Sequence, residues 1–169
     1  MCISALYNKS GQPPFSVYSH KFKDIKDVTD GAKVTIPNDP TNGGRALKVL
    51  ETAGLIKLKP EAGILATVGD VAENPKKVKF IEIESAQLPR ALDDVDLAVI
   101  NSNYALGANL NPLKDAIAIE AKDSPYANIV AVRADDNREV LQKLKSAITS
   151  PAVRDFILEK YKGSVVPAF

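Results

Sequence analysis

Apolar and polar side chains repeat with two different periods along the chain, and these periods predict its strands and helices. Alternation with a period of two, as in FSVYSHKF and VKFIEIE, predicts strands with one polar face. The run VDLAVI is apolar after Asp96, which is typical of a strand covered on both faces. Strands are therefore expected at 15–22, 33–37, 78–84, 95–100, 115–120 and 126–133. Residues 1–14, which end in two prolines, are expected to form a loop.

Helical periodicity fills the intervals between these strands. Asp39 is a suitable N-cap, Pro40 fits the first helical position, and Gly54 is a suitable end for the helix between them. Thr67 and Asp70 have the spacing of a capping box. Further helical segments are expected at 86–94, 104–110, 137–149 and 151–162. The alternation of strands and helices predicts an α/β layered fold with a largely parallel sheet.

The composition limits the classes of partner. The 169 residues suffice for a hydrophobic core, and 45% of them are hydrophobic. A net charge of +1, from 22 basic and 21 acidic residues, indicates no attraction to nucleic acid. No apolar run approaches the roughly 20 residues that a membrane helix needs. A small molecule or another protein is the expected partner.

The residues that usually carry catalysis are few. His20, the one histidine, lies beside lysines and is expected to be a solvated surface residue, and Cys2 has no histidine nearby in the sequence. The catalytic elbow, zinc and Walker motifs are absent, and DDVD lacks the spacing of a calcium loop. An acyl- or phosphoryl-transfer enzyme would need a nucleophile and a base that the sequence does not offer. No catalytic residue, metal or cofactor is therefore predicted.

One stretch, VTIPNDPTNGGRAL, has the composition of an anion site. Its two glycines would leave backbone N–H groups approachable in the first turn of a helix, where the helix dipole favours an anion. Arg45 follows directly, and its guanidinium matches a carboxylate with two parallel hydrogen bonds. The alternative is that Arg45 pairs with an acidic residue on the surface, and the local sequence leaves both interpretations open.

A second polar group follows the strand expected at 95–100. Asn101 and Asn103 come directly after it, and ligands of open α/β sheets bind beyond the carboxyl ends of strands. The strand at 33–37 likewise ends at the loop before Arg45. Amide oxygens can accept hydrogen bonds from an ammonium group, so an arginine beside asparagines suits a zwitterion such as an amino acid.

Several longer motifs resemble those of a known family. IPNDPTNGGRALKVLETAGLIKLK, ENPKKVKFIEIESAQLPRALDDVDLAVINSNYA, DSPYANIVAVR and GSVVPAF resemble, in this order, the NlpA/MetQ family of methionine-binding lipoproteins of bacterial ABC importers. The likeness runs from about Phe15 to Phe169. It implies a type II periplasmic-binding-protein fold, in which two α/β lobes joined by a hinge enclose the ligand.

The resemblance also implies roles for individual residues. Arg45 matches the arginine that binds the ligand carboxylate, and Asn101 matches the asparagine that contacts the amino-acid head group. Asn42 matches an asparagine of the PTN run and is a further ligand-binding candidate, as is Asn103 from its position after the strand. Tyr18 matches the tyrosine of the hinge strand, although the residues before it differ from the family pattern.

The largest departure from the family lies at the amino terminus. Residues 15–115 are expected to form the hinge strand and a complete second lobe, and residues 116–169 the hinge return and the C-terminal part of the first lobe. Residues 1–14 remain unassigned, and Cys2 has no apolar run before it that would make a lipidation site. Without the leading strands of the first lobe, residues 126–162 are expected to expose an apolar surface and to self-associate.

The sequence therefore predicts the substrate-binding component of an ABC importer, which binds L- or D-methionine, or a related small amino acid or dipeptide, without covalent chemistry. Its expected partner is the importer permease. The resemblance implies an extracytoplasmic lipoprotein anchored to the membrane. The alternative is a truncated remnant or interaction protein that keeps the fold and has lost ligand capture.

Overall fold

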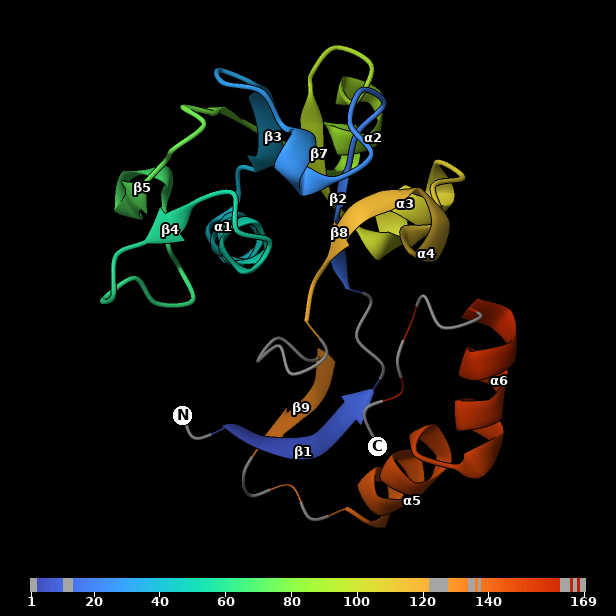
Figure 1. Cartoon of the computed structure of the whole chain (residues 1–169). Coiled ribbons are helices and arrows are strands. Elements are labelled where there is room, and N and C mark those ends of the chain that lie inside the picture. Colours follow the sequence, from blue (N-terminus) through green and yellow to red (C-terminus); the bar gives the residue numbers. More distant parts are fainter. Residues whose placement is uncertain are drawn as a thin grey trace. The chain divides into compact units, whose positions relative to one another are not determined.

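The computed structural model describes residues 3–10, 14–121, 128–133, 136, 138–161, 165 and 167 (Figure 1). The chain forms two compact units. Pro14–Lys122 is the sheet unit, and Met1–Pro13 together with Asp123–Phe169 is the terminal unit. The chain thus crosses from one unit to the other after Pro13 and again after Lys122.

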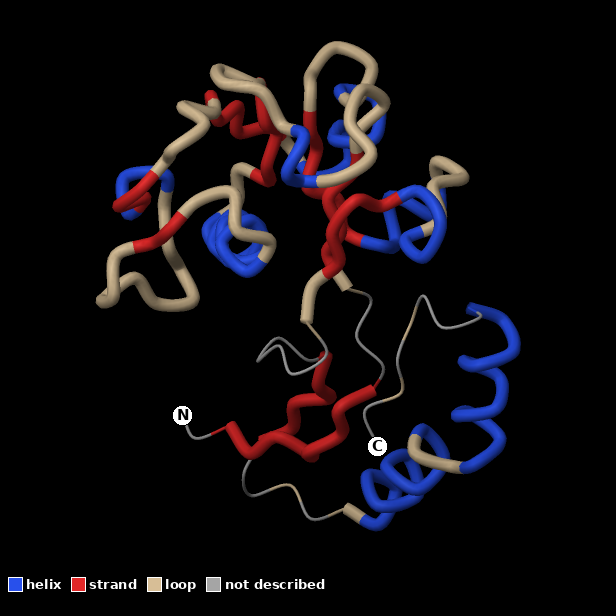
Figure 2. The backbone as a smooth tube through the Cα atoms, in the orientation of Figure 1, coloured by secondary structure: helices blue, strands red, loops and turns tan. Residues whose placement is uncertain are grey.

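The sheet unit contains a five-stranded sheet in the order β6-β3-β7-β2-β8. Figure 2 draws the strands in red. Its strands are β2 (Phe15–Tyr18), β3 (Lys33–Pro37), β6 (Lys79–Ile83), β7 (Leu97–Asn101) and β8 (Ala116–Ile119). β3 pairs in parallel with β6 and β7, whereas β2 pairs antiparallel with β7 and β8. The expected α/β class is confirmed, and the sheet is mixed because β2 opposes the direction of the other strands.

Helices cover both faces of this sheet. They are α1 (Pro40–Thr52), α2 (Leu88–Ala91), α3 (Ser102–Gly107) and α4 (Pro112–Asp115). One buried cluster contains residues of α1 together with Leu97 and Val99, and the other contains Leu88 of α2 together with Ala98 and Ile100. Successive residues of β7 therefore enter opposite cores, which confirms a strand covered on both faces.

The helix α1 begins and ends as its sequence predicts. Asp39 is the N-cap, and its carboxylate accepts a hydrogen bond of 3.0 Å from the backbone N–H of Asn42. Pro40 occupies the first helical position. Gly54, just past the helix, has a φ of +80°, a conformation that glycine adopts without steric penalty.

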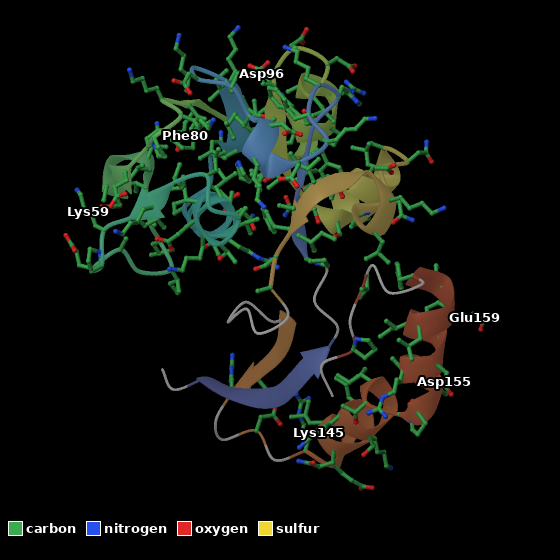
Figure 3. The ribbon with its side chains drawn as sticks, in the orientation of Figure 1. Lys59, Phe80, Asp96, Lys145, Asp155 and Glu159 are labelled. Atoms are coloured by element: carbon green, nitrogen blue, oxygen red, sulfur yellow. The ribbon has the colours of Figure 1, made fainter. Side chains whose placement is uncertain are left out.

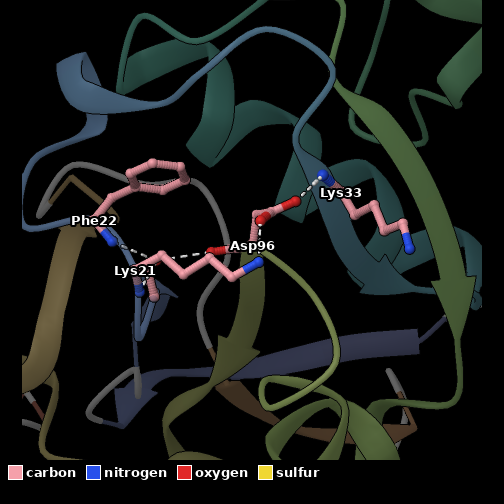
Figure 4. A network of polar contacts seen from close by, with 5 residues as sticks. Lys21, Phe22, Lys33 and Asp96 are labelled. Atoms are coloured by element: carbon pink, nitrogen blue, oxygen red, sulfur yellow. Dashed lines mark hydrogen bonds and ion pairs between the residues drawn. The ribbon is translucent and has the colours of Figure 1, made fainter.

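The strand expected at 15–22 ends four residues early, at Tyr18, because Ser19 turns the chain. The Ser19 hydroxyl donates to the backbone oxygen of Asp96 at 2.7 Å and accepts from the backbone N–H groups of Lys21 and Phe22. The Asp96 carboxylate binds the Lys21 ammonium at 2.6 Å and accepts from the backbone N–H of Lys33 at 2.7 Å (Figure 4). These bonds join segments distant in sequence, so local alternation could not reveal them.

A small lobe of irregular chain packs beside α1. It contains β4 (Lys57–Leu58) and β5 (Val71–Glu73), which pair antiparallel. Lys59, which directly follows β4, is labelled in Figure 3. The capping box of Thr67 and Asp70 is present, but it opens a single 3-10 turn rather than an α-helix. The turn ends at Asp70, because the strand β5 begins at the next residue.

The terminal unit contains β1 (Ile3–Ser10), β9 (Asn128–Arg133), α5 (Glu139–Ile148) and α6 (Pro151–Tyr161). The prediction of a loop at residues 1–14 is wrong, because Ile3 pairs with Arg133 and β1 runs antiparallel to β9. Its partner strand lies more than a hundred residues away, so the hydrogen bonds that form β1 are not visible in the local sequence. Both helices are confirmed, and the helix end predicted at Gly163 lies outside the described residues.

The helices of the terminal unit expose apolar side chains. Neither α5 nor α6 has a buried residue. The exposed fractions are 58% for Val140, 41% for Leu144, 54% for Phe156 and 49% for Leu158. Charged residues such as Lys145, Asp155 and Glu159 lie on the same two helices (Figure 3). Exposed apolar side chains thus lie on both helices, within the range where an apolar surface is expected, and the surface itself stays a prediction.

Replacement of Gly44 by alanine is expected to destabilise the protein by about 1–3 kcal/mol, because the new methyl group has no space. A Cβ at Gly44 would lie 2.5 Å from the Ile64 backbone oxygen and 2.9 Å from the Ala66 nitrogen. Alanine favours a helix over glycine by about 1 kcal/mol, so a net loss identifies the clash. Urea unfolding measures it.

Gly63→Ala is the matched control, because a Cβ at Gly63 meets nothing within 4 Å. Equal unfolding midpoints for Gly44→Ala and Gly63→Ala would contradict the close packing of α1 against the 64–66 segment.

Candidate functional site

The candidate site is centred on Arg45, whose side chain lies in a nearly buried ion pair with Glu120. Arg45 Nε donates to Glu120 Oε1 at 2.9 Å and to Oε2 at 3.1 Å, and Arg45 Nη2 lies 2.5 Å from Oε2. Only 12% of the Arg45 side chain and 7% of the Glu120 side chain are exposed. Arg45 therefore does pair with an acidic residue, as one interpretation expected, but this pair lies beneath the surface.

Phe15 connects the two charged side chains to the backbone of the sheet. The Arg45 guanidinium lies over the Phe15 ring, 4.5 Å from its centroid. The Phe15 N–H donates to Glu120 Oε2 at 2.9 Å, and the Glu120 N–H donates to the Phe15 carbonyl oxygen at 2.9 Å. Both ions are thereby fixed at the end of β2 where the chain enters the sheet unit.

Asn101 lies at the same end and on the same face of the sheet. It is the last residue of β7 and the antiparallel partner of Phe15, and directly opposed residues of an antiparallel pair point to one side. Asn101 Oδ1 is buried and has no hydrogen-bond partner among the described residues. The structure thus brings Arg45 and Asn101 together around Phe15.

This arrangement can receive a small zwitterion. A guanidinium binds a carboxylate, and a buried carboxamide oxygen without a donor is costly unless something donates to it. An ammonium group is a suitable donor. A guanidinium and an unpartnered carboxamide oxygen are thus the groups to which the carboxylate and the ammonium of an amino acid would bind.

The N-terminus of α1 does not form the anion site that the glycines predicted. The N–H of Asn42 already donates to the Asp39 carboxylate, and the N–H of Gly43 donates to the Asp39 backbone oxygen at 2.8 Å. Gly43 and Gly44 are buried, and a Cβ on Gly43 would lie 2.9 Å from the Pro37 oxygen. The glycines therefore serve close packing, and the Asp39 charge already occupies the helix end.

The other expected site residues lie apart from this centre. The Asn42 amide donates to the Asp39 carboxylate at 2.9 Å, so it supports the N-cap. Asn103 is exposed on α3. Tyr18 is buried within β2, and its hinge role and the ligand-binding roles of the asparagines stay predictions.

Glu120 and Phe15 are site residues that the sequence patterns did not indicate. Glu120 directly follows β8, whose direction is that of β7, so it stands after a strand in the same way as Asn101. The rule that polar residues beyond strand ends form sites would have found it. Phe15 gave no such signal, because an apolar residue at the start of a strand is usually core.

Burial raises the pKa of Tyr18 to about 12. Its hydroxyl has no hydrogen-bond partner among the described residues.

Within the described part of the chain, no group of three or more His, Cys, Asp or Glu side chains could hold a metal ion. None of the helices among the described residues is both long enough and apolar enough to cross a membrane.

Comparisons with known proteins show which proteins this chain is similar to. The family model described as NlpA lipoprotein matches residues 7–169, which begins ahead of Phe15. The probable D-methionine-binding lipoprotein MetQ of Vibrio cholerae is 46% identical over 154 residues, covering 90% of this chain and 57% of that protein. The D-methionine-binding lipoprotein MetQ of Escherichia coli K12 is 46% identical over 156 residues, covering 90% and 58%. The chain thus spans less than two thirds of the length of these relatives.

Solved structures show the same fold. A nutrient binding protein from Burkholderia cenocepacia bound to methionine has a TM-score of 0.91 and 54% identity, with 99% of this chain and 70% of that chain covered. A periplasmic substrate-binding protein of an ABC transporter from Coxiella burnetii has a TM-score of 0.90 and 46% identity, with 98% and 70% covered. The expected fold of a periplasmic substrate-binding protein is confirmed.

Replacement of Tyr18 by phenylalanine is expected to remove a loss of stability at alkaline pH. The folded-state pKa of about 12 exceeds the ordinary value of 10.0, so the unfolded chain releases this proton first. The wild-type free energy of unfolding should therefore fall by about 1.5 kcal/mol between pH 10 and 11.5 relative to Tyr18→Phe. At pH 7 the two should differ by less than about 1 kcal/mol, because the hydroxyl has no partner to lose.

Tyr104→Phe is the control, because Tyr104 is exposed. Urea unfolding at pH 7, 10 and 11.5 provides the comparison, and equal alkaline losses in wild type and Tyr18→Phe would contradict the burial of the hydroxyl.

Proposed function

This chain belongs to the NlpA lipoprotein family, and we propose that it is part of an ABC importer's substrate-binding protein that binds methionine through Arg45 and Asn101. The binding is non-covalent and needs neither a cofactor nor a catalytic residue. Arg45 holds the ligand carboxylate, and Asn101 accepts a hydrogen bond from the ligand ammonium.

The convergence of Arg45 and Asn101 on Phe15 is the observation that carries this proposal. The buried Asn101 oxygen supports it independently, because native proteins pair nearly all buried polar atoms and an exception favours a ligand as the missing donor. The names of the relatives, and the methionine in the Burkholderia cenocepacia structure, support methionine as this ligand.

The remaining parts of the proposal rest on the relatives. They are named as lipoproteins, so the protein is proposed to be extracytoplasmic and anchored to the membrane by a lipid, with the importer permease as its partner. L-methionine, D-methionine and a related dipeptide are all compatible with a head-group site of this chemistry. Asn42 and Asn103 are further ligand-binding candidates, and Tyr18 is a hinge candidate.

Asn101→Ala is expected to lower methionine affinity at least tenfold while leaving the folded state about as stable as wild type. The loss of one hydrogen bond to a charged group is worth about 1.5–3 kcal/mol of binding. The unliganded protein loses little, because Asn101 Oδ1 is unpartnered and the side chain makes no cap bond to α3. Isothermal titration with L- and D-methionine measures the first effect, and urea unfolding the second.

Asn38→Ala is the matched control, because Asn38 is an exposed amide that follows the neighbouring strand β3. If a folded preparation binds methionine no better than alanine, recognition of the methionine side chain by this chain is refuted. Equal affinities of Asn101→Ala and Asn38→Ala would refute the role of Asn101.

A second candidate is an interaction protein that keeps the fold without ligand capture, and the exposed apolar residues of α5 and α6 favour it. On this hypothesis the apolar surface is covered by a second copy of the chain. Apolar patches that remain exposed commonly mark contact sites.

Phe156→Glu is therefore expected to weaken self-association at least tenfold, since a charge at a buried apolar contact is costly. Gln142→Glu, an exposed change of equal charge on α5, is the control. Sedimentation equilibrium over a range of concentrations measures both variants. A wild-type chain that stays monomeric at every concentration contradicts the hypothesis.

A further inference from the structure

The geometry points to Glu120 as a positioning and specificity-determining residue of the head-group site. It fixes the orientation of the Arg45 guanidinium and makes the site prefer a zwitterion to a simple carboxylate. This inference rests on the proposed function and deepens it, because it concerns which ligands Arg45 accepts.

Contacts with Glu120 and Phe15 restrain the Arg45 side chain. An arginine side chain is long and flexible, and ordering it costs conformational entropy. Here Glu120 receives hydrogen bonds from both Nε and Nη2, while the Phe15 ring covers the guanidinium at 4.5 Å. The guanidinium plane is thereby fixed before any ligand arrives, which lowers the entropy that binding must overcome.

Glu120 is itself restrained by Phe15. Its carboxylate accepts the Phe15 N–H, and its own N–H donates to the Phe15 carbonyl oxygen, each at 2.9 Å. Phe15 is fully buried. Glu120 is therefore fixed to the backbone of β2. Because Glu120 also binds Arg45, the Arg45 side chain is held in a defined position relative to the sheet.

The charge balance at the pair bears on which ligands it accepts. Arg45 and Glu120 together are neutral, and both are nearly buried, where charges interact more strongly than in water. A ligand with only a carboxylate would leave one uncompensated negative charge beside them. A zwitterion brings its own ammonium, for which the unpartnered Asn101 oxygen is the acceptor, and leaves the site neutral.

Two ligands that differ only in the ammonium group test this inference with the full chain. L-methionine is compared with 4-(methylsulfanyl)butanoate, which has the same carboxylate and thioether and no amine. Wild type is expected to bind methionine at least tenfold more tightly. Glu120→Gln keeps the size of the side chain and removes its charge, and it is expected to shift the ratio of the two dissociation constants at least tenfold toward the amine-free acid.

Two controls separate positioning from general stability. Glu82→Gln removes an exposed carboxylate from β6 and should leave the ratio unchanged. Glu120→Asp keeps the charge and should retain most of the wild-type preference. Urea unfolding measures the stability of each variant. A loss of stability alone would weaken the binding of both ligands equally and would leave the ratio of their dissociation constants unchanged.

A measurement without ligand tests the positioning directly. The Arg45 Nε–H, bound to a nearly buried carboxylate, is expected to give a resolved NMR signal with slow solvent exchange, which Glu120→Gln speeds at least tenfold while Glu82→Gln does not. An unchanged exchange rate in Glu120→Gln overturns positioning by Glu120.

The outcomes distinguish this inference from the proposed function. If wild type binds neither ligand at millimolar concentration, the proposed function and the specificity are both refuted. The exchange rate of the Arg45 Nε–H then tests by itself whether Glu120 positions Arg45. If wild type binds both ligands equally, the specificity is refuted even where Glu120→Gln does not fold. If the exchange rate changes and the ligand ratio does not, Glu120 is a structural partner of Arg45 only.

Discussion

The ion pair between Arg45 and Glu120 ties the helix α1 to the end of β8, beside the start of the neighbouring strand β2. A buried guanidinium without this carboxylate would carry a large desolvation penalty, and a buried carboxylate without the guanidinium would carry another. Because each charge depends on the other, neither can move alone. The Phe15 backbone bonds then fix the pair to the sheet.

The same contact bears on how the proposed site would hold a charged ligand in a chain of nearly zero net charge. The chain carries 22 basic and 21 acidic residues, so no long-range field draws an anion to it. Selectivity must come from close contacts of fixed geometry, and the buried Asn101 oxygen beside Phe15 provides one that a neutral or anionic group without a donor cannot satisfy.

Among the residues whose burial the structure describes, the sheet unit buries apolar side chains, whereas the two helices of the terminal unit leave theirs exposed. Both buried clusters belong to the sheet unit, and α5 and α6 of the terminal unit bury none of their described side chains. The chain spans 57% of its Vibrio cholerae relative and 70% of the Burkholderia cenocepacia structure. An amphipathic helix is stable only when another surface covers its apolar face, so the terminal unit is where a partner surface would add most stability.

Elements with local signals could be predicted from the sequence. The cap of Asp39, the end at Gly54, the strand β3 and the two-faced burial of β7 depend on residues within a few positions of each other. The sequence also placed Arg45 and Asn101 as candidates, since both follow strands of one sheet. The remaining features could be seen only in three dimensions. The strand β1, the reversed direction of β2, the packing of Gly44 and the pairing of Arg45 with Glu120 all depend on partners far away along the chain, and local periodicity carries no information about them.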